Sequence, residues 1–359
     1  MRLAAAQMYR YRLPLARPLA LGGATLTHRS GLVVALHDDA GEIRYGDIAP
    51  LPGFSTETLD EAASEARRLV RSMLSSPRHG QPAHVHGIKD RADSFDNLSG
   101  PPSVLFGLQS ALVGCGRAGT RPAGVLVNAL VAGPDEDAAR DLVRAGYTSA
   151  KLKVGRNTVE EDATRVRDFW NALEGQVALR LDANRAWDSA AALRFSDQIR
   201  DVSVEYIEEP VDNAHDLERF AESSRIPVAI DETARDVEDA SAYLAANDYI
   251  TAVVLKPTLL PGAIAGARRW AEAAREHGVT PVISSAFESG LGVAALASLA
   301  SELMPESVPA GLDTYKWLAA DVLSTRFAVR NGALELRQVN ECASSVDLDR
   351  CEKVWDVSG

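Results

Sequence analysis

Residues 149–155 read Ser-Ala-Lys-Leu-Lys-Val-Gly. Its residues alternate as in a β-strand, where side chains two positions apart point to the same face. Lys151 and Lys153 therefore project together, while Leu152 and Val154 point to the opposite face, where helices can cover them. Two neighbouring ammonium groups repel each other, which lowers the cost of losing one proton. A lysine with a lowered pKa can act as a general base, although an isolated pair is more often a solvated edge strand.

The strand belongs to a repeating pattern that begins at Gly124, in which short apolar runs alternate with amphipathic helical segments. Such alternation favours a parallel sheet, and eight strands at this spacing predict a (β/α)₈-type barrel. No Gly-x-Gly-x-x-Gly follows an early strand and no Walker-type loop is present, which disfavours a doubly wound nucleotide-binding sheet. The predicted strands are Val125–Val131, Ser149–Val154, Val177–Asp182, Val204–Glu208, Val228–Asp231, Ala252–Leu255, Thr280–Ser284 and a weaker Ala310–Leu312.

Residues 1–120 lack this rhythm and indicate a separate first domain. Its predicted elements are two antiparallel strands (Gly31–His37 and Ile43–Ile48), a long flexible loop (Pro14–Ser30, with Gly22 and Gly23) and two helices (Glu57–Leu74 and Ser103–Cys115). The barrel is assigned to residues 121–315. Residues 316–359 depart from the rhythm, and we expect them to pack back toward the first domain.

The bulk composition restricts the partners and the compartment. A net charge of −12 over 359 residues argues against nucleic acid and anionic membranes, but not against an anionic small molecule in a locally positive site. The 3 cysteines (Cys115, Cys342 and Cys351) are widely spread and give neither a disulfide framework nor a thiolate metal cluster. His84 and His86 have no suitable third ligand nearby, so we expect no metal there. No signal peptide or membrane span is evident, so we expect a cytoplasmic protein. The sequence does not determine the oligomeric state.

An ionisable side chain stands at the end of five successive predicted strands: Lys153, Asp182, Glu208, Asp231 and Lys256. Any one of these residues could simply form a salt bridge or cap a helix, but five in succession indicate a site. The C-terminal ends of barrel strands meet at one mouth, where barrel enzymes place their chemistry. Glu209 follows Glu208 and would point the other way in a strand, so it is not included.

The five side chains together predict a reaction type. Three carboxylates without a nearby cysteine or histidine suit Mg²⁺, or Mn²⁺, rather than zinc. A lysine stands on each side of the carboxylates in strand order. Abstraction of a proton alpha to a carboxylate requires this combination, because cations must hold the developing ene-diolate while a lysine of lowered pKa removes the proton.

Five short motifs resemble the signature of the enolase superfamily, and within it the muconate-lactonizing-enzyme subgroup. They are Lys151-Leu152-Lys153, Asp182-Ala183-Asn184, Ile207-Glu208-Glu209-Pro210, Asp231-Glu232 and Lys256-Pro257. The resemblance implies an α/β fold: a modified (β/α)₇β TIM-type barrel with an α+β capping domain built from the N-terminal region and the C-terminal tail. It also implies Mg²⁺ held by Asp182, Glu208 and Asp231, with Lys153 and Lys256 as the catalytic residues.

Four further stretches, at residues 50–58, 179–187, 284–289 and 311–314, resemble the o-succinylbenzoate synthase family. That family implies Mg²⁺-dependent dehydration of 2-succinyl-6-hydroxy-2,4-cyclohexadiene-1-carboxylate to o-succinylbenzoate in menaquinone biosynthesis. The substrate contacts expected on this basis are Lys151, Arg180, Asn184, Ser284 and Gly311. Arg180 could instead pair with a carboxylate. Ala286 and Gly290 stand where serine is frequent in the family, which affects only the details of substrate fit.

The sequence is also compatible with two other functions. The subgroup also contains N-acylamino acid racemases and dipeptide epimerases, which need two lysines on opposite faces of the substrate, and both lysines are present. A barrel that binds a ligand without catalysis is disfavoured, because neither a lysine nor a carboxylate of the signature is missing.

Overall fold

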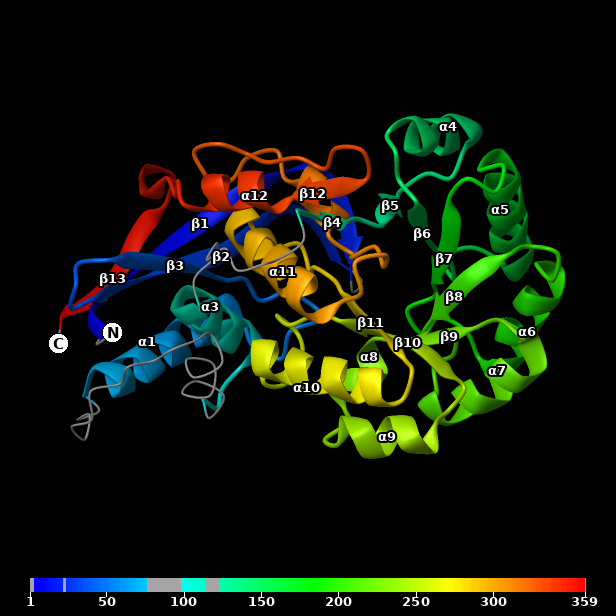
Figure 1. Cartoon of the computed structure of the whole chain (residues 1–359), viewed down its shortest axis with the longest axis horizontal. Helices are drawn as coiled ribbons and strands as arrows, with labels where there is room; N and C mark the ends of the chain where they lie inside the picture. Colours follow the sequence, from blue (N-terminus) through cyan, green and yellow to red (C-terminus); the bar gives the residue numbers. More distant parts are fainter. Residues whose placement is uncertain (1–2, 22–23, 76–97, 114–122, 359) are drawn as a thin grey trace.

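The computed structural model describes residues 3–21, 24–75, 98–113 and 123–358. An antiparallel sheet with helices α1 and α3 forms one side of the molecule, and a curled parallel sheet forms the other, with α10 and α11 between them (Figure 1). Gly22 and Gly23 of the predicted loop, the histidines at 84 and 86 and the cysteine at 115 lie outside the described residues.

The antiparallel sheet has the order β13-β1-β2-β3, with β1 at Leu3–Leu21, β2 at Ala24–Asp38, β3 at Ile43–Ile48 and β13 at Glu352–Ser358. The prediction of a flexible loop over Pro14–Ser30 is wrong, because β1 and β2 stay paired from Pro14 and His28 to Leu21 and Ala24, with one register shift. Leu19 and Leu21 are buried in an apolar cluster with Trp317, and this contact explains why the hairpin is extended.

Two helices pack on this sheet. Helix α1 (Leu59–Ser75) buries the stripe that contains Ala62, Ala66 and Val70. Helix α3 (Pro102–Val113) crosses β3 so closely that a Cβ on Gly46 would overlap the carbonyl oxygen of Gly107. The close approach requires glycine and fixes where α3 lies.

The parallel sheet follows chain order from β5 to β11, as the strand rhythm predicted. Its strands are β5 (Ala129–Val131), β6 (Ser149–Lys153), β7 (Ala178–Asp182), β8 (Val204–Glu208), β9 (Val228–Ile230), β10 (Ile250–Leu255) and β11 (Thr280–Ile283). The helices are α4 (Glu136–Arg144), α5 (Val159–Ala172), α6 (Ser189–Gln198), α7 (Leu217–Ser224), α8 (Glu232–Arg235), α9 (Ala240–Ala246), α10 (Ala263–Glu276) and α11 (Gly290–Leu303). Short 3₁₀ turns lie at Ala214–Asp216, Asp313–Trp317 and Leu348–Arg350.

The last predicted strand, Ala310–Leu312, is present only as two parallel bridges. Ala310 is bridged to Val127, near β5, and Gly311 is bridged to Ser284, just after β11. These two bridges join the two edges of the sheet and close the barrel.

The predicted strand Val125–Val131 is two strands, because the chain changes partner in its middle. Strand β4 (Gly124–Leu126) pairs antiparallel with β12 (Ala333–Glu335), and only β5 joins the barrel. Helix α12 (Leu336–Ala343) follows β12, and β13 then pairs with β1. The tail therefore contacts both the barrel and the N-terminal sheet. Among the described residues, no helix is long and apolar enough to span a membrane.

The start of α11 is held by buried carboxylates from both ends of the sequence. Asp47 Oδ2, in β3, accepts hydrogen bonds from the backbone N–H and the hydroxyl of Ser289 at 2.9 and 2.8 Å. Asp321 Oδ1, in the tail, accepts from the N–H of Gly290 at 3.0 Å. Negative charge at a helix N-terminus is stabilising, so this junction ties three separate segments together.

Candidate active site

The structure brings the five predicted side chains together at the C-terminal ends of β6 to β10. Strand register places Lys153 beside Asp182, and Asp182 beside Glu208. The residues Asp182, Glu208 and Asp231 are each at most 1% exposed. The ammonium of Lys256 is hydrogen-bonded to Asp231 and lies 3.7 Å from Glu208 Oε1. The five side chains, which are spaced one strand–helix unit apart in the sequence, therefore form one buried cluster.

The two lysines of the opening motif have different surroundings. Lys151 Nζ lies 2.9 Å from Glu208 Oε2 and 3.2 Å from Asp182 Oδ2. Lys153 Nζ lies 3.6 Å from Asp182 Oδ2 and donates to the amide oxygen of Asn184 at 2.7 Å. Lys151 thus lies between two carboxylates, whereas Lys153 is farther from its single charged partner and bonds a neutral one.

These surroundings set opposite pKa shifts. Burial lowers the pKa of Lys153, and the positive charges of Lys151, Lys256 and Arg156 lower it further against the opposing effect of Asp182. Burial also acts to lower the pKa of Lys151, but the neighbouring Asp182 and Glu208 raise it well above its usual value. Lys153 is therefore the lysine best suited to act as a base.

Lys256 keeps its proton. Burial acts to lower its pKa, but Asp231 and Glu208 reverse that effect and raise the pKa above its usual value. Lys256 is thus a fixed positive charge on the side of the cluster where Asp231 lies.

The chemistry of the cluster fits a divalent cation. Asp182 Oδ1 and Glu208 Oε1 are buried and have no hydrogen-bond partner among the described residues. Buried carboxylate oxygens that accept no hydrogen bond are costly, and hard oxygen donors are the ligands that Mg²⁺ prefers. In the present arrangement ammonium groups bridge the carboxylates, and within the described ranges no three Asp, Glu, His or Cys side chains converge closely enough to hold a metal ion.

Of the two roles considered for Arg180, the structure shows pairing with a carboxylate. Its guanidinium donates to both oxygens of Glu205, at 2.9 and 3.0 Å, and to the carbonyl oxygen of Pro309 at 2.8 Å. The residue is 1% exposed and its guanidinium also lies over the ring of Tyr206. We therefore reassign Arg180 from substrate contact to the interior of the barrel.

Ser284 and Gly311 meet where the barrel closes. The Ser284 hydroxyl donates to the carbonyl oxygen of Gly311 at 3.3 Å, and a Cβ at position 311 would overlap that hydroxyl. Glycine is therefore required for the two segments to approach each other.

A cavity of about 240 Å³ opens on Lys153. The described residues that line it include the cations Lys153, Arg156 and Arg165 but no carboxylate, together with apolar side chains from both halves of the chain: Leu19, Leu21, Leu130, Phe287 and Trp317. A cationic end and apolar walls suit a small carboxylate with an apolar body. Arg156 stands only three residues after Lys153, but it lies beyond the strand end and no spacing in the sequence marks it as part of the site.

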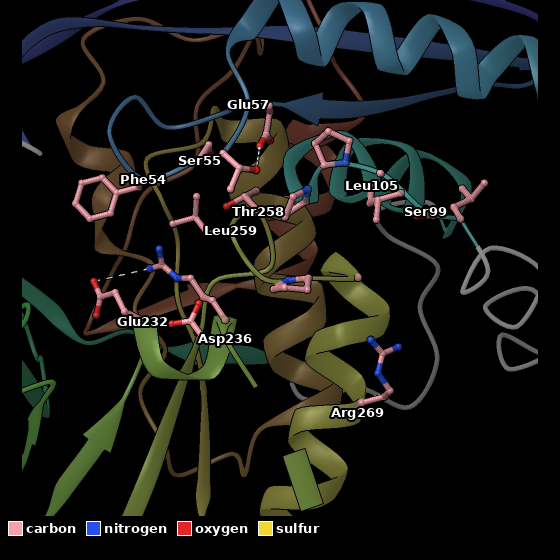
Figure 2. Close-up of a pocket in the computed structure, with 18 of the residues that line it drawn as sticks. Phe54, Ser55, Glu57, Ser99, Leu105, Glu232, Asp236, Thr258, Leu259 and Arg269 are labelled. Atoms are coloured by element: carbon pink, nitrogen blue, oxygen red, sulfur yellow. Dashed lines mark hydrogen bonds and ion pairs between the residues drawn. The ribbon is translucent and has the colours of Figure 1, made fainter. Parts of the chain in front are cut away.

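A second cavity of about 850 Å³ lies beside the mouth (Figure 2). Figure 2 shows Phe54, Ser55 and Glu57 on the side of the N-terminal segment, and Glu232, Asp236 and Leu259 on the side of the barrel. Lys153 does not line this cavity, and the acidic and basic side chains that do line it are equal in number. The smaller cavity is therefore the better candidate for the substrate.

Comparisons with known proteins identify both halves of the chain. The family model "Enolase C-terminal domain-like" matches residues 135–340, and the model "MenC, N-terminal domain" matches residues 2–115. The o-succinylbenzoate synthase of Edwardsiella ictaluri is 36% identical over 89% of this chain and 92% of its own. The o-succinylbenzoate synthase of Vibrio cholerae (strain M66-2) is 35% identical over 86% of this chain and 89% of its own.

Solved structures share the fold at lower identity. The L-Ala-D/L-Glu epimerase of Bacillus subtilis superposes with a TM-score of 0.79 at 21% identity, over 93% of this chain and 96% of that one. The muconate lactonizing enzyme of Pseudomonas fluorescens, complexed with muconolactone, also gives 0.79, at 24% identity over 93% and 94% of the chains. The expected fold class is confirmed. By family models and relatives together, the chain belongs to the enolase superfamily and, within it, to the o-succinylbenzoate synthase family.

Proposed function

We propose that the protein is an o-succinylbenzoate synthase, a Mg²⁺-dependent lyase of menaquinone biosynthesis that dehydrates 2-succinyl-6-hydroxy-2,4-cyclohexadiene-1-carboxylate. The observation that carries the proposal is Lys153, a lysine of lowered pKa that lies beside buried carboxylates and at the edge of a cationic, apolar-walled cavity. The curated relatives with this activity cover nearly the whole chain and support the same substrate.

The proposed reaction begins with Lys153 as a neutral amine, which removes the proton on the ring carbon that carries the carboxylate. The electron pair of that C–H bond forms the new ring double bond, and the ring C–O bond breaks. Lys153 then returns the proton to the departing hydroxide on the same face, so that water leaves and the ring becomes aromatic. Asn184 orients the amine through its 2.7 Å hydrogen bond, and Lys256 supplies fixed positive charge.

Asp182, Glu208 and Asp231 are the residues proposed to hold Mg²⁺, or Mn²⁺ in its place. When bound, the ion supplies positive charge beside the substrate carboxylate, which makes the adjacent proton more acidic. The two buried carboxylate oxygens that accept no hydrogen bond, on Asp182 and Glu208, support this assignment.

We propose that different segments of the chain form the catalytic barrel and its cap. We assign residues 1–120 to a capping domain, 121–315 to the catalytic barrel and 316–359 to a segment that returns to the cap. Leu19, Leu21 and Leu51 from the cap pack with Leu259, Ala286 and Trp317 from barrel loops and the tail. Such an apolar cover would exclude water from the reaction. We also propose a cytoplasmic location, a small carboxylate as the partner and no role in nucleic acid binding.

The first test is Lys153→Ala. Turnover of the cyclohexadiene substrate should fall by about 10³-fold or more, because the base is lost, while Mn²⁺ and o-succinylbenzoate still bind. Turnover is followed by ultraviolet absorbance and binding by calorimetry. Lys353→Ala, which removes an exposed lysine paired with Asp356 on β13, is the control and should be fully active. Substantial turnover by Lys153→Ala would exclude the proposed base.

A second activity on the same scaffold is favoured by one observation. Lys153 and Lys256 approach the carboxylate cluster from different strands, Lys153 at Asp182 and Lys256 at Asp231. Racemisation of N-acylamino acids or epimerisation of dipeptides needs a base on one face of the α-carbon and an acid on the other, and Lys256, whose pKa is raised, would be the acid. Incubation with N-succinylamino acids in D₂O and measurement of Cα deuterium separates this activity from dehydration, and absence of exchange excludes it.

A further inference from the structure

Glu209 is a buried carboxylate for which the proposed reaction has no direct use. It follows Glu208 at the end of β8 and is 0% exposed. Its backbone has φ +44°, a left-handed conformation that is costly for a residue other than glycine and persists only where the surroundings enforce it. The side chain therefore leaves the alternation of the strand and turns toward the neighbouring loops.

Both oxygens of Glu209 are fully used, mostly by the turn that begins with Asp231. Oε1 accepts from the backbone N–H of Asp231 at 2.9 Å and of Thr233 at 2.7 Å. Oε2 accepts from the Thr233 hydroxyl at 3.0 Å and from Arg185 Nε at 3.0 Å. Three of the four donors thus belong to the turn that carries Asp231.

Arg185, the fourth donor, connects Glu209 to the residue that accepts a hydrogen bond from Lys153. Arg185 also donates its backbone N–H to the carbonyl oxygen of Glu209 at 2.8 Å, and Arg185 Nη2 donates to the Thr233 hydroxyl at 2.8 Å. Asn184 precedes Arg185, and both residues have positive φ, +47° and +57°. Asn184 in turn accepts the hydrogen bond from Lys153.

We propose that Glu209 is a positioning residue that fixes Asp231 on one side and the Asn184–Arg185 turn on the other. Its hydrogen bonds and its ion pair go to Asp231, Thr233 and Arg185 and not to Lys153 or Lys256, so its effect passes through these neighbours. The inference rests on the proposed function, because Asp231 matters as a metal ligand and Asn184 as the partner of the base. One carboxylate would then set the metal site and the orientation of the base together.

Two substitutions separate the two sides. Glu209→Ala removes every acceptor, so Mn²⁺ affinity, measured by the electron paramagnetic resonance signal of free Mn²⁺, should fall about 10- to 100-fold. Glu209→Gln keeps one oxygen for the N–H groups of Asp231 and Thr233 but turns an amide NH₂ toward Arg185. Its Mn²⁺ affinity should stay within about threefold of wild type, while kcat falls about tenfold with little change in KM. A merely structural role would lower the melting temperature and leave both quantities unchanged.

The matched control is Asp321→Ala, which removes another buried carboxylate that accepts backbone N–H groups, far along the chain from the metal residues. It should lower stability and leave Mn²⁺ affinity unchanged. Wild-type protein that neither binds Mn²⁺ nor forms o-succinylbenzoate would refute the proposed function itself. Suppose instead that the wild-type protein binds Mn²⁺ and forms o-succinylbenzoate. A folded Glu209→Ala variant whose Mn²⁺ affinity is within twofold of wild type would then overturn only this inference. Should Glu209→Ala fail to fold, an unchanged kcat in Glu209→Gln overturns it.

Discussion

At the residue scale, two lysines two positions apart on one strand are prepared for different tasks. Lys151 lies within 3.2 Å of two carboxylates and keeps its proton, whereas Lys153 has one carboxylate at 3.6 Å and the neutral amide of Asn184. The motif places both side chains on one face, but it cannot say which lysine lies closer to the acids. The distances favour Lys153 as the base, and its role remains a prediction until the variant is assayed.

Arg156 provides a second test at this scale. It lines the cavity beside Lys153 and is exposed, so its charge is available to a bound carboxylate. Arg156→Gln should weaken binding of o-succinylbenzoate about tenfold, or about 1.4 kcal/mol. Isothermal titration calorimetry measures the change. Arg156→Lys, which keeps the charge, should stay within about threefold, and Arg140→Gln on α4 should bind normally. Binding by Arg156→Gln within twofold of wild type would remove this residue from the site.

At the scale of elements, the sequence predicts strand bounds well where turn residues or a charged strand end delimit a short β-prone run. Strands β3 and β8 begin and end at the predicted residues, although Ile43 in β3 and Glu205 in β8 are exposed. Pro14–Ser30 could not be predicted as strand, since Leu19 and Leu21 are buried by Trp317, a contact between distant parts of the sequence. Ala310–Leu312 gave a weak signal because only two bridges form there.

The same contrast applies to the site. Five side chains could be predicted because strand spacing alone brings them together. Strand alternation predicts that Glu209 points away from the mouth, and no local pattern shows that its positive φ directs it to the Asp231 turn. Arg180 remained ambiguous because its partner, Glu205, lies on the next strand.

The α11 junction gives the prediction at this scale. A Cβ on Gly290 would overlap Asp321 Oδ2 and crowd the Tyr315 hydroxyl, both of which are buried. Gly290→Ala should therefore lower the free energy of unfolding by about 2–4 kcal/mol, measured by urea denaturation. Gly133→Ala is the control, because no atom lies within 4 Å of its added Cβ, and it should change stability by less than about 0.5 kcal/mol. Equal stability of the two variants would show that the junction tolerates a methyl group.

At the scale of the whole molecule, the N-terminal sheet depends on the tail. Strand β13 covers one edge of β1, from Ala5 opposite Ser358 to Arg10 opposite Glu352. Removal of residues 352–359 would expose that edge, and unpaired edges recruit other chains. The truncated protein should melt at a lower temperature and elute partly as oligomers in size-exclusion chromatography. An unchanged melting temperature and elution volume would show that β13 is dispensable.

The pairing of β1 with β13 also orders events during synthesis. The ribosome releases β1 before the barrel and β13 only after it, so the sheet that carries Leu19 and Leu21 is completed last. Until β13 is released, the edge of β1 that pairs with it is open. Contacts between residues as far apart in the sequence as those of β1 and β13 form slowly. The open edge of β1 thus makes the nascent chain prone to aggregation in the interval after the barrel has been synthesised and before β13 pairs. A chaperone that binds extended apolar segments would act on β1 during that interval.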